Sequence, residues 1–343
     1  MPKRQTDMWL NSKKTIIATL FFGVLCTQFI TSCSTNSESV DVSNIKVNVN
    51  ILRIDEELMN LKDKAEIQSF VNKNARFFAE FYRTNPADSA LINQLDVITH
   101  HPDSRALYEQ AKETFGDLSE LKAQFEVAFK HIKYYYPDFK EPKIITTFSG
   151  LEKDIYVSDS MIVVSLESFI GPKAKYRPQQ PAYILRRYHK AYIVPTIVKF
   201  MSQKYNKVNP DDKTLLADMV FFGKSFEFTR EMLPNVSDSL IVDYPDSTLQ
   251  KTWVAQDLVW AHFIDKKLLY ETDLRIKSKY IDERPKTLEV GPECPGRIAQ
   301  WVGWRIVNRY RTENPDISLQ DLMKNPDAQD IFQKSKYKGQ IED

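Results

Sequence analysis

The sequence is poor in glycine, with nine glycines among 343 residues. A phosphate-binding loop needs several glycines close together, because backbone without side chains has to wrap around the anion. No such cluster occurs in this chain, so we expect no nucleotide binding. The 47 basic and 46 acidic residues nearly cancel, and no basic recognition motif stands out. We therefore expect no nucleic-acid partner.

The sequence also lacks the HExxH motif, in which two histidines one helical turn apart bind zinc. No two of its histidines stand four positions apart; they are His100, His101, His131, His189 and His262. The G-x-S-x-G motif of a serine nucleophile is absent as well. These absences predict a protein that is not an enzyme and that holds neither a metal nor a cofactor.

The N-terminus has the composition of an export signal. Three lysines and one arginine supply positive charge, and residues 15–30 form an apolar stretch that is short for a membrane span. The run Ile30-Thr31-Ser32-Cys33 resembles the lipobox of bacterial lipoproteins. That resemblance implies cleavage before Cys33 and attachment of acyl chains such as palmitate to this cysteine, which together anchor the protein to a membrane.

Cleavage before Cys33 would change both the charge and the cysteine content. It removes four of the 47 basic residues and one of the 46 acidic residues, which leaves a net charge of about −2. Cys26 leaves with the signal and Cys33 carries the lipid, so Cys294 remains alone. We therefore expect neither an intramolecular disulfide nor a metal site with two cysteines.

Composition along the chain predicts four parts. Residues 1–32 are the lipoprotein signal peptide, and residues 33–44 are a flexible tether rich in Ser, Thr and Asn. Residues 45–338 are a single globular domain without an internal linker or repeat, and residues 339–343 are a C-terminal tail. The predicted location is the cell envelope, on the periplasmic side. The sequence does not decide between the inner and the outer membrane.

Apolar periodicity predicts an α+β fold that is mostly helical. Alternation predicts a first strand over 45–55, with Asp55 as a helix cap, and three short strands between 142 and 171 that form an antiparallel meander. Apolar residues three and four apart predict long helices elsewhere. Their segments are 57–71, 75–83, 118–137, 182–201, 213–233, 249–270 and 296–310. Within 182–201, Pro195 predicts a kink or an early end.

Five segments form a recognisable set: "RIDEEL", "YYYPDFKEPKIITTFSG", "VSLESFIGPKAKY", "FFGKSFEFTREMLP" and "GRIAQWVGWRIVNRYRTENPDISLQDLM". Together they resemble the GldB family of gliding-motility lipoproteins. The resemblance runs from about Ile45 to Tyr337 and includes the lipobox. It implies a membrane-anchored envelope protein that is required for gliding over surfaces and works beside a motility machine coupled to protein secretion.

A more distant likeness is to zinc peptidases of the zincin type, and it implies a degenerate zincin-like fold. Where those enzymes carry HExxH, this chain has His189 followed by Lys190, and Phe222 stands where a third ligand precedes Gly223. A lysine ammonium would repel the metal. We therefore expect a pseudoenzyme that keeps the cleft, with five polar residues as candidates for its lining: His189, Lys190, Asp218, Lys224 and Arg297.

The sequence thus predicts a lipid-anchored, non-catalytic protein that binds a partner or a peptide within the motility or secretion apparatus. One alternative is an envelope hydrolase related to the metallopeptidases. Another is a structural or chaperone-like factor that supports other motility lipoproteins. The sequence leaves the identity of the partner open.

Overall fold

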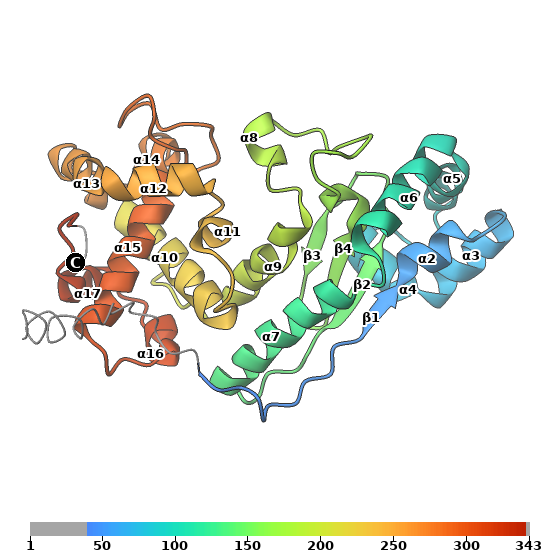
Figure 1. The fold of residues 1–343 in the computed structure, drawn as a ribbon, viewed down its shortest axis with the longest axis horizontal. Helices are drawn as coiled ribbons and strands as arrows, with labels where there is room; N and C mark the ends of the chain where they lie inside the picture. The colour runs from blue at the N-terminus through green and yellow to red at the C-terminus, as the bar shows by residue number, and fades with distance from the viewer. Residues whose placement is uncertain (1–39, 341–343) are drawn as a thin grey trace, which may run out of the picture. The chain divides into compact units, whose positions relative to one another are not determined.

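The computed structural model describes residues 40–340 and shows a mostly helical α+β fold with one small sheet (Figure 1), as predicted. The sheet has four strands in the order β1-β2-β4-β3. β1 pairs in parallel with β2 and β2 in parallel with β4, whereas β3 and β4 are antiparallel. The strands are β1 (Ile51–Arg53), β2 (Lys143–Thr147), β3 (Ile155–Val157) and β4 (Met161–Ser165).

The predicted antiparallel meander is wrong. β3 and β4 form the expected hairpin. Segment 148–154 carries the chain past the position of β4, so β4 lies between β2 and β3 in the sheet. Burial explains why β2 and β4 are parallel and central. Ile145 and Val163 pack on a cluster with the N-terminal helices, and Ile144 and Ile162 pack on the larger core. Strands buried on both faces are typical of parallel pairing.

The first strand is shorter than predicted, and Asp55 does not cap a helix. Asp55 lies in the first turn of α2, fully buried, and accepts hydrogen bonds from Arg53 and from the Thr146 hydroxyl at 2.5 Å. The N-terminal helical segments are α2 (Ile54–Met59), α3 (Lys64–Lys73), α4 (Ala75–Phe77), η1 (Phe78–Tyr82), α5 (Ser89–His100), α6 (Pro102–Phe115) and α7 (Ser119–Tyr135).

The single helix predicted over 182–201 is broken into three pieces. Pro195 lies in the first turn of α9, where its missing N–H leaves no intrahelical bond unmade, so the helix starts there rather than ending. The segments after the sheet are η2 (Leu166–Phe169), α8 (Ala182–Leu185), η3 (Lys190–Tyr192), α9 (Ile193–Ser202), α10 (Leu215–Met232), α11 (Asp238–Val242), α12 (Asp246–Val254), α13 (Gln256–Asp265), η4 (Leu268–Tyr270), α14 (Leu274–Ile281), α15 (Ile298–Glu313), α16 (Leu319–Lys324) and α17 (Ala328–Ser335).

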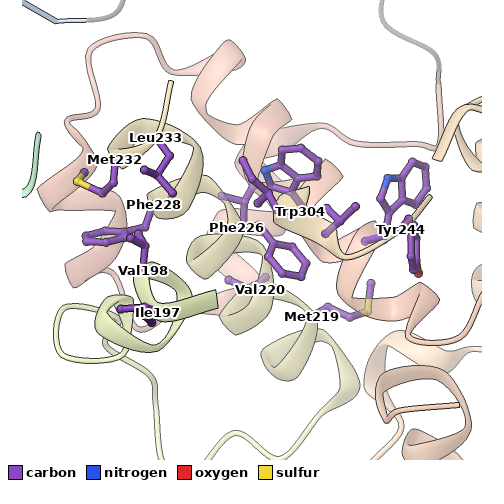
Figure 2. Packing of buried hydrophobic residues seen from close by; sticks show 14 of the residues in the cluster. Ile197, Val198, Met219, Val220, Phe226, Phe228, Met232, Leu233, Tyr244 and Trp304 are labelled. Carbon is purple, nitrogen blue, oxygen red and sulfur yellow. The ribbon is translucent and has the colours of Figure 1, made fainter. Parts of the chain in front are cut away.

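Helices α10 and α15 cross at the centre of the larger core (Figure 2). A Cβ atom on Gly303 would overlap the carbonyl oxygen of Met219, and one on Gly223 would overlap the carbonyl oxygen of Gly303. The two backbones are therefore in direct contact, which glycine alone permits. Phe226 of α10 and Trp304 of α15 meet edge to face beside this crossing, with ring centres 6.3 Å apart.

A buried carboxyl group holds the loop that follows β2. The Glu167 side chain is 1% exposed, and its Oε1 accepts hydrogen bonds from the backbone N–H of Ser149 at 2.7 Å and of Leu151 at 3.2 Å. Both Gly150 and Leu151 have positive φ, near +70°. Burial raises the pKa of Glu167 from 4.5 to about 7, because the charged form loses its hydration.

This shift predicts a pH dependence of stability. A carboxyl group with a raised pKa in the folded state contributes stability below pH 4.5, and that contribution is lost as the pH rises through about 7. The wild type should lose roughly 3 kcal/mol of unfolding free energy between pH 5 and pH 8. Glu167→Gln should not show this loss, and urea unfolding at both pH values measures the difference. Glu152→Gln, an exposed change in the same loop, should follow the wild type. Equal pH dependence in all three proteins would contradict the assignment.

Lipidation of Cys33 and the signal peptide over 1–32 lie outside the described residues. Residues 33–39 of the predicted tether and residues 341–343 of the predicted tail lie outside them as well. Among the described helices, none combines the length and the apolar character that a bilayer crossing requires.

Candidate functional site

A cavity of about 570 Å³ lies between the sheet and the helices that follow it. Strand β3 and helix α9 are neighbours in space (Figure 1). Both contribute residues to the lining of the cavity. Aromatic side chains line much of it, among them Phe169, Tyr188, Phe200, Phe221 and Phe222. Phe222 also packs against the larger core.

A second hollow of about 170 Å³ lies beside this cavity, and Val157 of β3 is part of its lining. Phe200 of α9 lines both, so the two lie next to each other. Ile155 lines the first, and Val157, at the other end of the strand, lines the second. We call the two together the β3 groove.

Strand β3 lies at the edge of the sheet and, within the described residues, pairs with β4 alone. The N–H of Ser165 bonds to the carbonyl of Asp154 and the N–H of Ser158 bonds to that of Met161, both at 2.8 Å. Since antiparallel strands alternate their bonding direction, the peptide groups of Ile155 and Val157 point away from β4. The Ile155 N–H bonds to the Asp154 carboxylate at 2.6 Å. The N–H and carbonyl of Val157 and the carbonyl of Ile155 therefore lie on the outer edge of the sheet.

A buried cluster of charges forms the inner wall of the cavity around Asp243. Its carboxylate lies 2.7 Å from Lys199 Nζ, 3.5 Å from Arg297 Nη1 and 3.7 Å from Arg187 Nη1. Burial alone would raise the pKa of Asp243, but the three cations outweigh it and hold that pKa below its usual value. Burial lowers the pKa of Lys199 in spite of Asp243.

Glu283 at the rim ties two of these cations together. It forms a two-point ion pair with Arg187, at 2.9 and 2.8 Å, and lies 3.1 Å from Arg297 Nε. The backbone carbonyl of Asp243 accepts from Arg186 and from Arg297. Asp243 adopts φ +58°, the left-handed turn that ends α11, and this turn brings its side chain to the cations.

Of the five residues predicted to line the cleft, the cavity includes Arg297. Lys224 lies elsewhere, 1% exposed, and its Nζ donates to the carbonyls of Lys207, Met323 and Asn325 at 2.7, 3.3 and 2.8 Å. Burial lowers its pKa to about 7. Three acceptors match the three hydrogens of an ammonium group. Lys224 therefore joins α10 to the loop after α9 and to the end of α16, and it does not line the β3 groove.

The other three candidates also lie outside the lining of the cavity. His189 precedes η3, where its Nδ1 accepts from the N–H of Ala191 at 3.3 Å. Lys190 pairs with Glu120 of α7 at 2.6 Å, beside a different, small hollow. Asp218 pairs with the buried Lys277 at 2.6 Å, which joins α10 to α14. The structure thus does not bring the five together, because helix positions alone do not fix which neighbour each side chain meets.

Sequence reasoning missed the residues that dominate the site. Arg187, Lys199, Asp243 and Glu283 come from four different segments, and their spacing carries no motif. One signal existed: Asp243 is a lone charge in "LIVDYP", directly after an apolar run. An acidic residue in such a place is typical of a buried, paired charge.

Among the residues that the structure describes, no three His, Cys, Asp or Glu side chains converge as metal ligands would. Burial raises the pKa of the Cys294 thiol to about 12, so it stays protonated at neutral pH and is a poor nucleophile.

The family model described as gliding motility protein GldB matches residues 35–339. The chain belongs to the GldB family. Membership implies a gliding-motility lipoprotein, anchored to a membrane of the cell envelope, and the described fold is thus a GldB fold. Searches of the curated proteins and of the solved structures found no match.

Proposed function

We propose that this GldB-family protein is a non-catalytic component of the motility and secretion apparatus that holds an extended segment of a partner protein in the β3 groove. One observation carries the proposal. An edge strand with outward-facing peptide groups borders a groove that follows it from Ile155 to Val157. An added strand would bond to those peptide groups while its side chains enter the hollows.

The polar residues near the groove support binding rather than catalysis. Asp243, Glu283 and their cations are bound to one another, and His189 bonds to backbone. None of them shows the pairing of a nucleophile with a base that covalent catalysis uses. We further propose that Cys33 carries the lipid, that the domain faces the periplasm, and that the fold is a zincin-like scaffold without its metal.

The groove predicts the effect of a backbone change. Val157→Pro removes the outward N–H of β3 without touching a bond to β4, which an edge strand tolerates. We expect loss of gliding with little change in thermal unfolding. Val157→Thr keeps the N–H, so cells that carry this variant should glide normally. If Val157→Pro cells glide, or if both variants stop gliding, strand addition at β3 is refuted.

Photo-crosslinking in gliding cells tests for a partner directly. A crosslinking residue at Phe200, which is 49% exposed and lines both hollows, should trap one protein of the motility apparatus. The matched position is Val254, which is 75% exposed and lies on α12, away from the groove. Crosslinked products at Val254 but not at Phe200 would refute binding of a partner in the β3 groove. Loss of other motility lipoproteins on depletion, without a crosslink at Phe200, would favour the chaperone-like alternative.

A further inference from the structure

The inner wall of the β3 groove holds more buried positive charge than negative charge. The side chains of Arg187, Lys199 and Arg297 are 19%, 14% and 7% exposed, and they share one buried carboxylate, that of Asp243, which is 8% exposed. Glu283 is 41% exposed at the rim. Uncompensated charge away from water is costly, so this wall favours an additional anion.

Two other acidic residues line the cavity, and neither removes the excess. Asp154 already has two hydrogen-bond donors, because its carboxylate accepts from the hydroxyl of Tyr188 at 2.8 Å and from the N–H of Ile155. Asp282 is exposed to solvent, where water screens its charge. The buried excess therefore stays with the cations around Asp243.

The cluster also has an unused donor. The Nε of Arg187 is buried without a hydrogen-bond partner, although its two Nη atoms bind Glu283. A guanidinium group binds carboxylates through parallel N–H bonds, so Arg187 can serve a second anion while it keeps the first.

The lining of the cavity is also rich in aromatic rings. Phe169 stacks on Tyr188 with ring centres 5.5 Å apart, and Phe221 meets Phe222 edge to face at 5.3 Å. The volume of about 570 Å³ is far larger than a carboxylate needs. A ligand that fills it presents an apolar or aromatic side chain together with its negative charge.

We propose that this cavity recognises a carboxylate on the segment held in the β3 groove, next to an apolar side chain, through Arg187, Lys199 and Arg297. The inference rests on the proposed function, because the same groove holds the segment. The carboxylate comes either from an acidic side chain or from a free C-terminus, and the two sources share this chemistry.

Three synthetic peptides test the proposal on the full-length protein in detergent, by calorimetric titration. The first is acetyl-Val-Thr-Val-Phe with a free carboxylate, the second is the same peptide as its amide, and the third is acetyl-Val-Glu-Val-Phe amide. We expect at least one of the charged peptides to bind about tenfold more tightly than the neutral amide, as one charge-assisted contact provides. The charged peptide that binds more tightly identifies the source of the carboxylate.

Variants locate the contact. Arg187→Gln should abolish the advantage of the charged peptide, whereas Arg284→Gln, whose guanidinium pairs with Glu289, should keep it. Glu283→Gln removes the anion that competes for Arg187 and Arg297, so it should tighten binding of the charged peptide several-fold. Misfolding cannot produce tighter binding, which separates this result from a structural defect.

The outcomes distinguish the two proposals. Equal binding of all three peptides, lost in Val157→Pro, would overturn carboxylate recognition and leave the groove in place. No binding of any peptide would overturn both. Weaker binding of charged peptides to Glu283→Gln than to the wild type would also refute the inference.

Discussion

Gly303→Ala is expected to destabilise the domain by about 3 kcal/mol or more, as an overpacked core contact does. The added Cβ would overlap the carbonyl oxygen of Met219, so α15 would have to move away from α10 along the whole crossing. Alanine gains only about 1 kcal/mol over glycine in a helix interior. The overlap outweighs this gain because both atoms belong to packed backbone that cannot rotate aside.

Urea unfolding of the purified domain measures the effect. Gly291→Ala is the matched control, since a Cβ there meets nothing within 4 Å and the residue lies in a loop. We expect its midpoint to stay close to that of the wild type. A Gly303→Ala midpoint equal to that of the control would contradict direct backbone contact between the two helices.

Asp243→Asn is expected to cost about 3 kcal/mol or more, because it removes the single buried anion among three cations. Asparagine has nearly the same shape and tolerates the left-handed conformation at φ +58°, so the backbone is not the cause. The charge is. The cations left behind would stay desolvated without a partner, and side chains from α9 and α15 would separate.

Its control is Asp265→Asn, which breaks an exposed pair with Lys266. Exposed pairs contribute between zero and about 1 kcal/mol. Chemical unfolding of both variants at neutral pH compares the two environments. A loss no larger for Asp243→Asn than for Asp265→Asn would show that water reaches the cluster and weakens its charges.

The long helices of the core were predictable because their signal is local. Segments 118–137, 213–233 and 296–310 place apolar residues on one face, and the structure has α7, α10 and α15 there. Trp301 and Trp304, which that spacing puts in the core, are each 1% exposed. Periodicity failed over 182–201, where apolar residues at similar spacing come from separate short pieces.

Predictions about single residues fared less well than predictions about elements. Arg297 lines the cavity, but Lys224, an equally plausible polar residue on α10, is buried against backbone carbonyls instead. Both look alike in the sequence: each is a charge beside a glycine on a helix rich in apolar residues. What separates them is the set of groups that each one meets after folding.

The sequence by itself determined the α+β class, most core helices and the resemblance that the family match bears out. These depend on neighbours within a few positions, where apolar spacing decides which face of an element is buried. The tertiary structure alone decided the strand order, the contact between Gly223 and Gly303, and the cations around Asp243. These join residues tens of positions apart, and their energy comes from desolvation and close packing that exist only once the chain has folded.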